Sequence, residues 1–410
     1  LNMVQKKYYI CVTPFFPSPV RWQGAYVLDQ VKAIQRNSDY EVVVFKTNPL
    51  GLKEDDYEMD GIKVHVIRPF LMPSYILNGL TEGLVGQLFI RKLKTLGINL
   101  NQVAFVHCHT ASHGAFGFGV KKVNPKAKVL IQFHDLDPYT LRNGKWADKR
   151  WNVRYRAMKS LSAFNLADML ISISTPVQNN LLAFPKARPQ EVYPSYLQRL
   201  EQVKDFPNVK PKNTYILYNG VDTRVFNTVS SLNSHHDKNK FRIGCIGNFQ
   251  ELKDHITLIK AFNLLHKRGY KNMVLSLLGT GETKNTCVKY LKENNLMQYV
   301  EWPKEVSHEH LPEFYHSLDL FVLPSIYEGF GCVYTEAYAC GVPFMGVYDQ
   351  GAAEVIEPNE RNKWLIKPHD YVALANLIER YYKERYEQHL CQPYDINVLI
   401  NDFLKKIESI

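Results

Sequence analysis

Short runs of apolar and β-branched residues alternate along nearly the whole chain with windows in which apolar residues recur at helical spacing. This alternation predicts an α/β fold built from βα units with parallel sheets. The strands expected in the first half are Tyr8–Val12, Glu41–Phe45, Lys63–Ile67, Phe105–Cys108, Lys128–Gln132, Met169–Ile173 and Tyr215–Tyr218. Those expected in the second half are Arg242–Ile246, Met273–Leu278, Leu320–Leu323, Phe344–Val347 and Trp364–Ile366.

A polar segment with almost no apolar periodicity, residues 226–240, separates the two sets of strands. We expect a solvated connector there, and no metal site at its His235–His236 pair. The sequence thus predicts two Rossmann-like parallel-sheet domains, residues 1–225 and 241–392, that face each other across a cleft. Residues 393–410 have a helical pattern, and we expect them to pack back toward the N-terminal domain.

Composition adds a charge to this picture. The chain has 410 residues, 45% of them hydrophobic and 22% charged, which is typical of a globular protein and excludes a disordered chain. Its 50 Lys and Arg residues outnumber 40 Asp and Glu residues, so the net charge of +10 indicates an anionic partner. Seven cysteines without metal-ligand spacing indicate a reduced, cytoplasmic setting, and we expect no signal peptide and no membrane span.

The densest candidate site is the segment 324–337, which follows an expected strand and runs into an expected helix. Gly329 and Gly331 would let the backbone approach a ligand closely, and the free N–H groups of the helix start favour phosphate oxygens. Glu328 lies in the loop and Glu336 in the first or second turn of the helix. Carboxylates so placed would accept hydroxyl groups of a sugar, although they could also simply complement the helix dipole.

A second loop of the same kind follows the first strand of the C-terminal domain. It contains Gly247, Asn248 and Lys253, and the ammonium group of the lysine suits a diphosphate. The loop Gly279-Thr280-Gly281 also ends a strand, but we interpret it as a tight turn rather than a ligand contact.

In the N-terminal domain, Gly24 stands at the expected start of a helix and could face the same phosphate. His134 follows a strand, and its imidazole could bind a sugar hydroxyl or serve as a structural donor; His107 and His109 are weaker candidates. Asp135 and Asp137 form a short D-x-D pattern, but it lies in the other domain from the phosphate loops, so we expect no metal.

These motifs resemble those of family-4 glycosyltransferases, retaining enzymes of the GT-B class. The resemblance is strongest over residues 215–370. It rests on the E-x7-E pattern of Glu328 and Glu336 and on the segments Ser317–Ser325, Ala337–Pro343, Tyr218–Asp222 and Asp254–Phe262; Gly24–Val27 fits more loosely.

The resemblance implies transfer of a sugar from a nucleotide-diphospho-sugar to an acceptor, with the anomeric configuration kept and without a metal or other cofactor. By position, Glu336 would bind the ribose, Glu328 the hydroxyls of the donor sugar, and Lys253 the diphosphate as the leaving group develops charge. His134 would touch the donor sugar.

The remaining contacts that the resemblance implies come from the backbone of the glycine-rich loop. Gly329, Phe330, Gly331 and Cys332 would bind the sugar and the diphosphate. The family usually carries an arginine after the glycine at position 247, and Asn248 stands there instead. Half of a cationic clamp is therefore missing, so either Asn248 donates neutral hydrogen bonds or another basic residue takes the place of the arginine.

Six of the ten excess positive charges lie between Leu141 and Ser160. At helical spacing Lys145, Lys149, Arg156 and Lys159 share one face, which could contact an anionic membrane surface that carries a lipid-linked acceptor. A solvated charged face, or a phosphate site for the acceptor, would give the same pattern.

We expect a retaining hexosyltransferase in cell-surface polysaccharide or glycolipid synthesis, located in the cytoplasm, where it could work at the inner face of the membrane. Two alternatives stay open. A sugar-nucleotide epimerase would share the fold, although its own catalytic carboxylates are not recognisable here. A nucleic-acid-binding protein is suggested only by the basic charge, and no nucleic-acid-binding module is recognisable, so we expect no nucleic-acid partner.

Overall fold

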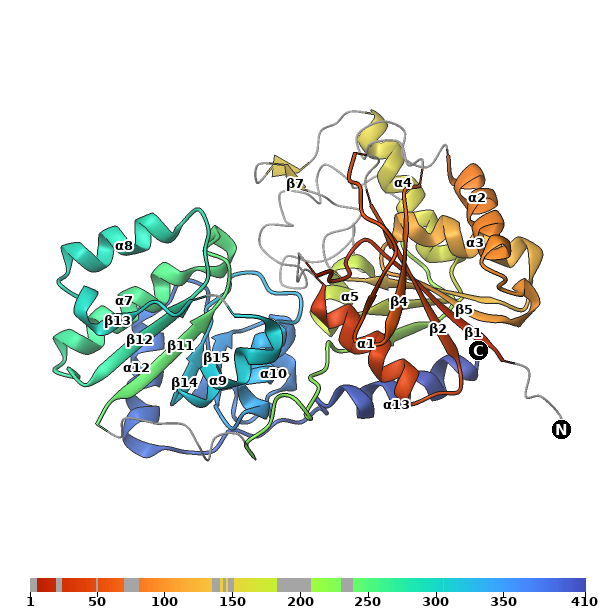
Figure 1. Ribbon diagram of the computed structural model, residues 1–410. Coiled ribbons are helices and arrows are strands. Elements are labelled where there is room, and N and C mark those ends of the chain that lie inside the picture. Colours follow the sequence, from red (N-terminus) through yellow and green to blue (C-terminus); the bar gives the residue numbers. More distant parts are fainter. Residues whose placement is uncertain are drawn as a thin grey trace. The chain divides into compact units, whose positions relative to one another are not determined.

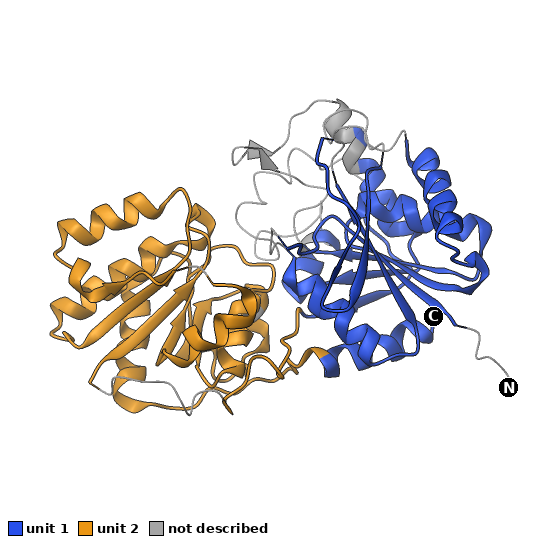
Figure 2. Ribbon diagram, in the orientation of Figure 1, with its two compact units in different colours: residues 1–218, 397–410 blue, residues 219–396 orange. Residues whose placement is uncertain are grey.

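The structure is a computed structural model of all 410 residues. It describes residues 6–19, 24–48, 51–69, 81–134, 141–142, 145–146, 151–182, 208–229, 239–304 and 306–410. The chain folds as two compact units (Figure 2). Unit 1 contains residues 1–218 and 397–410, and unit 2 contains residues 219–396.

Unit 1 is built on an eight-stranded sheet with the strand order β10-β9-β6-β5-β1-β2-β4-β3. All neighbouring strands are parallel except the edge pair β3 and β4. The strands are β1 (Tyr8–Thr13), β2 (Glu41–Thr47), β3 (Tyr57–Met59), β4 (Ile62–Ile67), β5 (Val103–Cys108), β6 (Lys128–Phe133), β9 (Met169–Ser172) and β10 (Thr214–Ile216). Leu141–Arg142 (β7) and Lys145–Trp146 (β8) form a separate antiparallel pair.

Helices cover both faces of this sheet because successive side chains of a strand point to opposite sides. Val44 of β2 packs in a buried cluster with Val27 of α1. The next residue, Phe45, points the other way and meets Phe89 of α2, with ring centroids 4.9 Å apart. The helices that the structure describes in unit 1 are α1 (Ala25–Arg36), α2 (Glu82–Thr95), α3 (Gly114–Val123), α4 (Trp151–Leu166), α5 (Thr175–Leu182) and nearly all of α13 (Ile396–Glu408).

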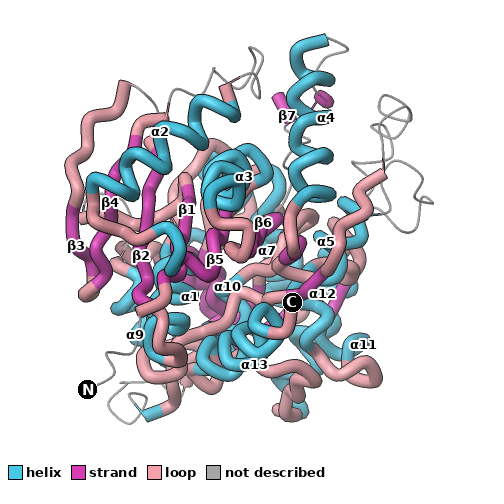
Figure 3. The backbone as a smooth tube through the Cα atoms, turned by 90° about the vertical axis from the view of Figure 1, so that its right-hand side faces the viewer, coloured by secondary structure: helices cyan, strands magenta, loops and turns pink. Residues whose placement is uncertain are grey.

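Figures 1 and 3 show α2 and α3 side by side on the sheet. Their backbones approach so closely at Gly86 and Gly119 that a Cβ on Gly119 would lie 2.6 Å from the Cα of Gly86. The C-terminal helix α13 also belongs to this unit. Its Phe403 ring lies 5.6 Å from Tyr215 of β10, and Tyr40 donates a 2.9 Å hydrogen bond to Glu408.

Unit 2 has a six-stranded, fully parallel sheet with the order β13-β12-β11-β14-β15-β16. Its strands are β11 (Phe241–Ile246), β12 (Met273–Leu278), β13 (Val300–Glu301), β14 (Leu320–Val322), β15 (Phe344–Val347) and β16 (Leu365–Ile366). Its helices are α7 (His255–Lys267), α8 (Lys284–Glu293), α9 (Leu311–His316), α10 (Cys332–Ala339), α11 (Arg361–Trp364) and α12 (Tyr371–Glu384). The expected strands all correspond to observed ones, whereas β3, β7, β8 and β13 had not been predicted.

The division between the units lies at Tyr218, ahead of the connector expected at residues 226–240. Val221 forms an isolated parallel bridge with Asp395, and its N–H donates to the carbonyl of Tyr394 at 2.8 Å. Phe226 is buried with its ring centroid 6.2 Å from that of Tyr315. Residues 219–229 therefore pack with unit 2, and unit 2 ends at residue 396 rather than at 392.

Candidate functional site

The two loops of unit 2 that the sequence singled out meet at an ion pair. Lys253 ends a 3-10 turn (Glu251–Lys253) after β11, and its Nζ donates to Oε2 of Glu328 in the loop after β14. The backbones are joined as well, since the N–H of Ile326 donates to the carbonyl of Leu252 at 2.9 Å. The side chains are only 24% and 14% exposed, so both charges are partly desolvated and oriented.

The glycine-rich loop between Glu328 and α10 has no room for a side chain at Gly331. Gly331 precedes α10 with a φ of +82°, a conformation that favours glycine, and a Cβ there would lie 2.6 Å from the Tyr334 ring and 2.8 Å from Cγ of Glu328. The same loop is held from its other side. A Cβ on Gly351 would lie 2.0 Å from the carbonyl oxygen of Gly329, and Gln350 Oε1 accepts the N–H of Glu328 at 2.8 Å.

Sequence analysis missed Gln350 and Gly351. A glycine soon after the end of β15, another parallel strand, was the available signal, because such strand ends converge at one edge of the sheet. Phe330 is buried, whereas Gly329, Gly331 and Cys332 keep part of their surface exposed. The exposed backbone of the loop and the first N–H groups of α10 are thus able to meet an anion.

Glu336 lies in the second turn of α10 and is 5% exposed. The hydroxyl of Tyr315 donates to its Oε2 at 2.7 Å, and Nε2 of His308 lies 3.0 Å from its Oε1. Burial, followed by the Glu336 charge, raises the pKa of Tyr315 well above its usual value, so the phenol stays protonated and donates. Each carboxylate oxygen keeps a second lone pair for another donor. Tyr315 and His308 had not been predicted.

The loop after β11 rests on the loop after β12. A Cβ on Gly279 would lie 2.1 Å from the carbonyl oxygen of Gly247, and the N–H of Phe249 donates to the carbonyl of Thr280 at 2.8 Å. Gly279 therefore acts as a packing element beneath Gly247. Asn248, the residue after Gly247, is exposed.

A further cation lies beneath the same loop. Nζ of Lys284 donates to the carbonyl of Gly279 at 3.0 Å and lies 5.5 Å from the ring centroid of Phe249, the residue after Asn248. Lys284 is therefore a basic side chain close to the position where the family usually has an arginine. Sequence analysis had not singled it out.

The start of α7 carries two buried titratable groups, Asp254 at its N-cap and His255 as its first residue. Asp254 has a φ of 48°, and its Oδ2 accepts from Thr257 at 2.7 Å and lies 2.9 Å from Nδ1 of His369. His255 stacks on Phe249 with centroids 3.9 Å apart, and burial lowers its pKa to about 4. His255 is therefore neutral at physiological pH, and the positive charge at this edge comes from Lys253 and Lys284.

In unit 1, three histidines stack at the carboxyl ends of β5 and β6. The rings of His107 and His109 lie 4.4 Å apart, those of His109 and His134 lie 5.2 Å apart, and Nδ1 of His109 is 3.0 Å from Nε2 of His134. The hydroxyl of Tyr9 forms a 2.7 Å hydrogen bond with Nδ1 of His107 at one end of this row. Burial lowers the pKa of His134 and of His107 to about 3, so both rings are neutral.

Gly24 lies near this stack. Its φ is +92°, and a Cβ would lie 2.6 Å from the carbonyl carbon of Phe15. The ring of Tyr26, two residues later, is 5.3 Å from that of His134. Nδ1 of His134 has no hydrogen-bond partner among the described residues, which leaves one ring nitrogen for another group.

Several predictions fall on parts of the chain that the structure does not describe. Asp135, Asp137 and Lys149 lie outside the described residues, as do the side chains of Lys145 and Arg156. Lys159 is described, and its Nζ lies 5.7 Å from the ring centroid of Tyr155. Within the described ranges no His, Cys, Asp and Glu side chains gather as a metal site, and no helix is long and apolar enough to cross a membrane.

Two family models match the chain, one in each unit. The model described as Glycosyltransferase Family 4 matches residues 23–195, and the model described as Glycosyl transferases group 1 matches residues 230–396. The chain belongs to glycosyltransferase family 4. The resemblance inferred from Glu328 and Glu336 is thereby confirmed.

This family-4 chain is 30% identical over 143 residues to the capsular polysaccharide biosynthesis glycosyltransferase CapM of Staphylococcus aureus. The aligned segment covers 34% of this chain and 36% of CapM. The chain thus spans about a third of the length of the first curated relatives that it matches.

Solved structures resemble the family-4 chain over nearly its full length. Sucrose-phosphate synthase from Thermosynechococcus elongatus superposes with a TM-score of 0.64 at 21% identity, covering 98% of this chain and 94% of that one. HepE of Anabaena, solved in complex with UDP, gives 0.65 at 17% identity, covering 98% and 100%. At these identities the likeness shows the fold, and it confirms the expected GT-B class with two Rossmann-like units.

Proposed function

We propose that this protein is a glycosyltransferase that moves a sugar from a nucleotide-diphospho-sugar to an acceptor in the synthesis of a cell-surface polysaccharide or glycolipid. The observation that carries the proposal is the meeting of Lys253, Glu328 and the glycine-capped start of α10 at one edge of the six-stranded sheet. The kinship with CapM, a capsular polysaccharide enzyme, and the UDP complex of HepE support it.

The proposed roles follow from the chemistry of each group. Lys253 and the N–H groups at the start of α10 would bind the diphosphate and stabilise the charge that develops as it leaves. The diphosphate would replace Glu328 as the partner of Lys253, so that the carboxylate of Glu328 could accept sugar hydroxyls. Glu336, oriented by Tyr315 and His308, would accept the ribose hydroxyls. Lys284 is the basic residue that we propose in place of the arginine missing at Asn248.

We further propose retention of the anomeric configuration without a metal. In this front-face reaction the bond between the anomeric carbon and the leaving phosphate oxygen breaks while the acceptor oxygen bonds to the same face. The leaving phosphate takes the acceptor proton, so no protein base is required. Neutral His134 would contribute a hydrogen bond to the donor sugar rather than a charge, because burial keeps its pKa at about 3.

Product analysis tests this proposal. Incubation with a nucleotide sugar should release free nucleoside diphosphate only when an acceptor is present, and NMR should show the anomeric configuration of the donor in the product. Turnover should be unchanged by EDTA. An inverted product, or a covalent sugar adduct on Glu328 in mass spectra with donor alone, would contradict the front-face mechanism.

We also propose that the enzyme works in the cytoplasm against an anionic membrane surface, through the basic face of Lys145, Lys149, Arg156 and Lys159. The sequence pattern supports this proposal, since six of the ten excess charges lie in this segment. Sedimentation with vesicles of phosphatidylglycerol tests it at low salt. Recovery of all the protein in the supernatant would contradict it.

A further inference from the structure

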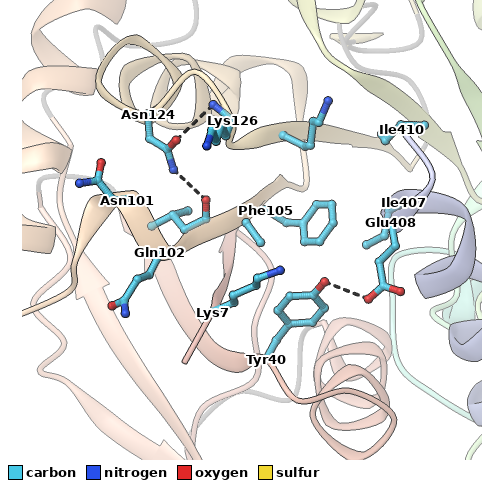
Figure 4. A pocket seen from close by; sticks show the side chains of 13 residues that line it. Lys7, Tyr40, Asn101, Gln102, Phe105, Asn124, Lys126, Ile407, Glu408 and Ile410 are labelled. Carbon is cyan, nitrogen blue, oxygen red and sulfur yellow. Dashed lines mark hydrogen bonds between the residues drawn. The ribbon is translucent and has the colours of Figure 1, made fainter. Parts of the chain in front are cut away.

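Figure 4 shows a cavity of about 630 Å³ in unit 1. It lies at the opposite end of the eight-stranded sheet from the histidine stack. The start of β5, the turn before β6 and the end of α13 form its walls. Val103, the first residue of β5, lines it, whereas His107 of the same strand belongs to the stack. At about 3.3 Å per residue, these two positions are about 13 Å apart, so the cavity is separate from the site described above.

The cavity is basic. Lys7, Lys126 and Lys128 line it together with a single acid, Glu408. Within the described part of the chain none of the three ammonium groups forms an ion pair, and Glu408 accepts from the hydroxyl of Tyr40 at 2.9 Å. Three cations and one carboxylate give this concave surface an excess of positive charge, which favours an anionic ligand.

The frame that carries Lys126 and Lys128 is fixed by a buried amide, and the carbonyl of Lys7 accepts the N–H of Glu41 at 2.8 Å. Nδ2 of Asn124 donates to the carbonyls of Leu100 and Val103 at 2.9 and 3.0 Å, and its Oδ1 accepts the N–H of Lys126 at 3.1 Å. Asn124 thereby ties the turn before β6 to the start of β5. The lysine backbones are held in place before any ligand arrives, which reduces the entropy lost on binding.

The remaining lining groups suit the rest of a sugar. The side-chain amides of Asn101 and Gln102 make no hydrogen bond within the described residues and can bind hydroxyls. The ring of Tyr40, held at 5.5 Å from Phe105, offers an apolar surface for the C–H face of a pyranose. Figure 4 shows Lys7 reaching into the cavity toward these two rings.

We propose that this cavity is a binding site for an anionic saccharide, in which the lysines pair with carboxylate or phosphate groups and the amides bind the hydroxyls. Its size is that of pockets that hold a few sugar rings. A neighbouring cavity of about 600 Å³ shares Tyr40 and is lined by Lys63 and by the Lys6–Glu41 ion pair, so a longer chain could continue across this edge toward Lys63. The proposal concerns a second site and does not depend on how the donor binds.

Isothermal titration of the full chain tests the proposal with three probes: tetragalacturonate as the carboxylate saccharide, glucose 6-phosphate as the phosphorylated sugar, and maltotetraose as the neutral control. At low salt the protein should bind at least one of the two anionic probes, more weakly as salt is added, and should bind maltotetraose far more weakly. The variant K7A/K126A/K128A should weaken the affinity by about tenfold or more.

The matched control is K53A/K94A/K122A, which removes the same charge from exposed positions of unit 1 outside the cavity and should bind like the wild type. Equal losses in the two triple variants, equal binding of maltotetraose, or no binding of either anionic probe would overturn the proposal. Binding of inorganic phosphate alone, without either sugar, would overturn its saccharide part. The donor site can be judged separately, because K253A should leave these titrations unchanged.

Discussion

The two units place different chemistry at the carboxyl ends of their sheets. Unit 2 carries charge there, in the Lys253–Glu328 pair and in the buried Glu336 with its two donors. Unit 1 carries the neutral row of Tyr9, His107, His109 and His134. The difference teaches that two sheets of the same kind can present opposite chemistry at the same edge: charged groups suit a diphosphate, and neutral donors suit hydroxyl groups.

The largest expected effect is that of acid pH, which should destabilise unit 1 more than unit 2. The pKa values of His107 and His134 are lowered to about 3 in the folded state, against about 6.5 in the unfolded chain. Their contribution to stability is therefore full above pH 6.5 and is lost as the pH falls toward 3. Between neutral pH and pH of about 4.5, unit 1 should lose several kcal/mol of unfolding free energy.

Hydrogen exchange, corrected for the intrinsic rate at each pH, measures this effect. Amides of β6 in unit 1 should lose more protection than those of β12 in unit 2, where burial lowers the pKa of His255 to about 4 and also lowers that of His266. Equal losses in β6 and β12 would remove the distinction between the units.

Removing the Lys253 charge of unit 2 should have the next largest effect, a loss of activity. K253A eliminates the cation proposed to stabilise the leaving diphosphate, and kcat/KM for the donor should fall by about a hundredfold to a thousandfold. K271A removes an exposed lysine of the same unit and should leave kcat/KM unchanged. If K253A kept wild-type turnover, Lys253 would be a structural partner of Glu328 and nothing more.

Alanine variants of two glycines with positive φ distinguish the cost of backbone strain from the cost of steric crowding. Gly331 has a φ of +82° and no room for a Cβ beside Tyr334 and Glu328, whereas Gly269 has a φ of +102° and open space around it. G331A should cost about 2–3 kcal/mol of unfolding free energy, and G269A only about 1 kcal/mol, the cost of the φ alone. Urea unfolding compares the two, and equal losses would show that the loop can relax around a methyl group.

The smallest expected effect concerns the hydrogen bond from Tyr315 to Glu336. Y315F removes a buried donor to a carboxylate, so the protein should lose about 1–2 kcal/mol of stability and the affinity for the nucleotide should fall severalfold. The control is Y290F, which removes the hydroxyl that accepts a hydrogen bond from Asn263 between α8 and α7 of the same unit. A similar loss of affinity in Y290F would show that the effect is general destabilisation.

Periodicity was enough to find the long parallel strands, because each repeats apolar residues between turn signals. It did not find β3, β13 or the β7–β8 pair, in which two or three residues are too few to show a period. The equally short β10, β14 and β16 were found because each lies in an uninterrupted apolar run. The division between the units was misplaced by the same means: Val221 and Phe226 look like the end of the first domain, yet they pair and pack with residues of unit 2 far along the chain.

The candidate site was predictable wherever a loop carried its own signal, as at Gly331 and Lys253. Contacts between loops that are far apart in the sequence could not be predicted. Lys253 and Glu328 are 75 residues apart and had been given separate roles, and nothing in the sequence shows that they touch. Tyr315 reads as an ordinary core aromatic, because its hydrogen bond to Glu336 depends on how α9 packs against α10.

A thermal-shift titration with a panel of nucleotide sugars and their nucleoside diphosphates tests the central claim most directly. A bound donor stabilises the folded state by mass action, so at least one nucleotide sugar should raise the Tm of the wild type. The shift should shrink in both K253A and E336A and persist in K271A. A shift that is unchanged in K253A and E336A would contradict the placement of the donor at the Lys253–Glu328 edge of unit 2.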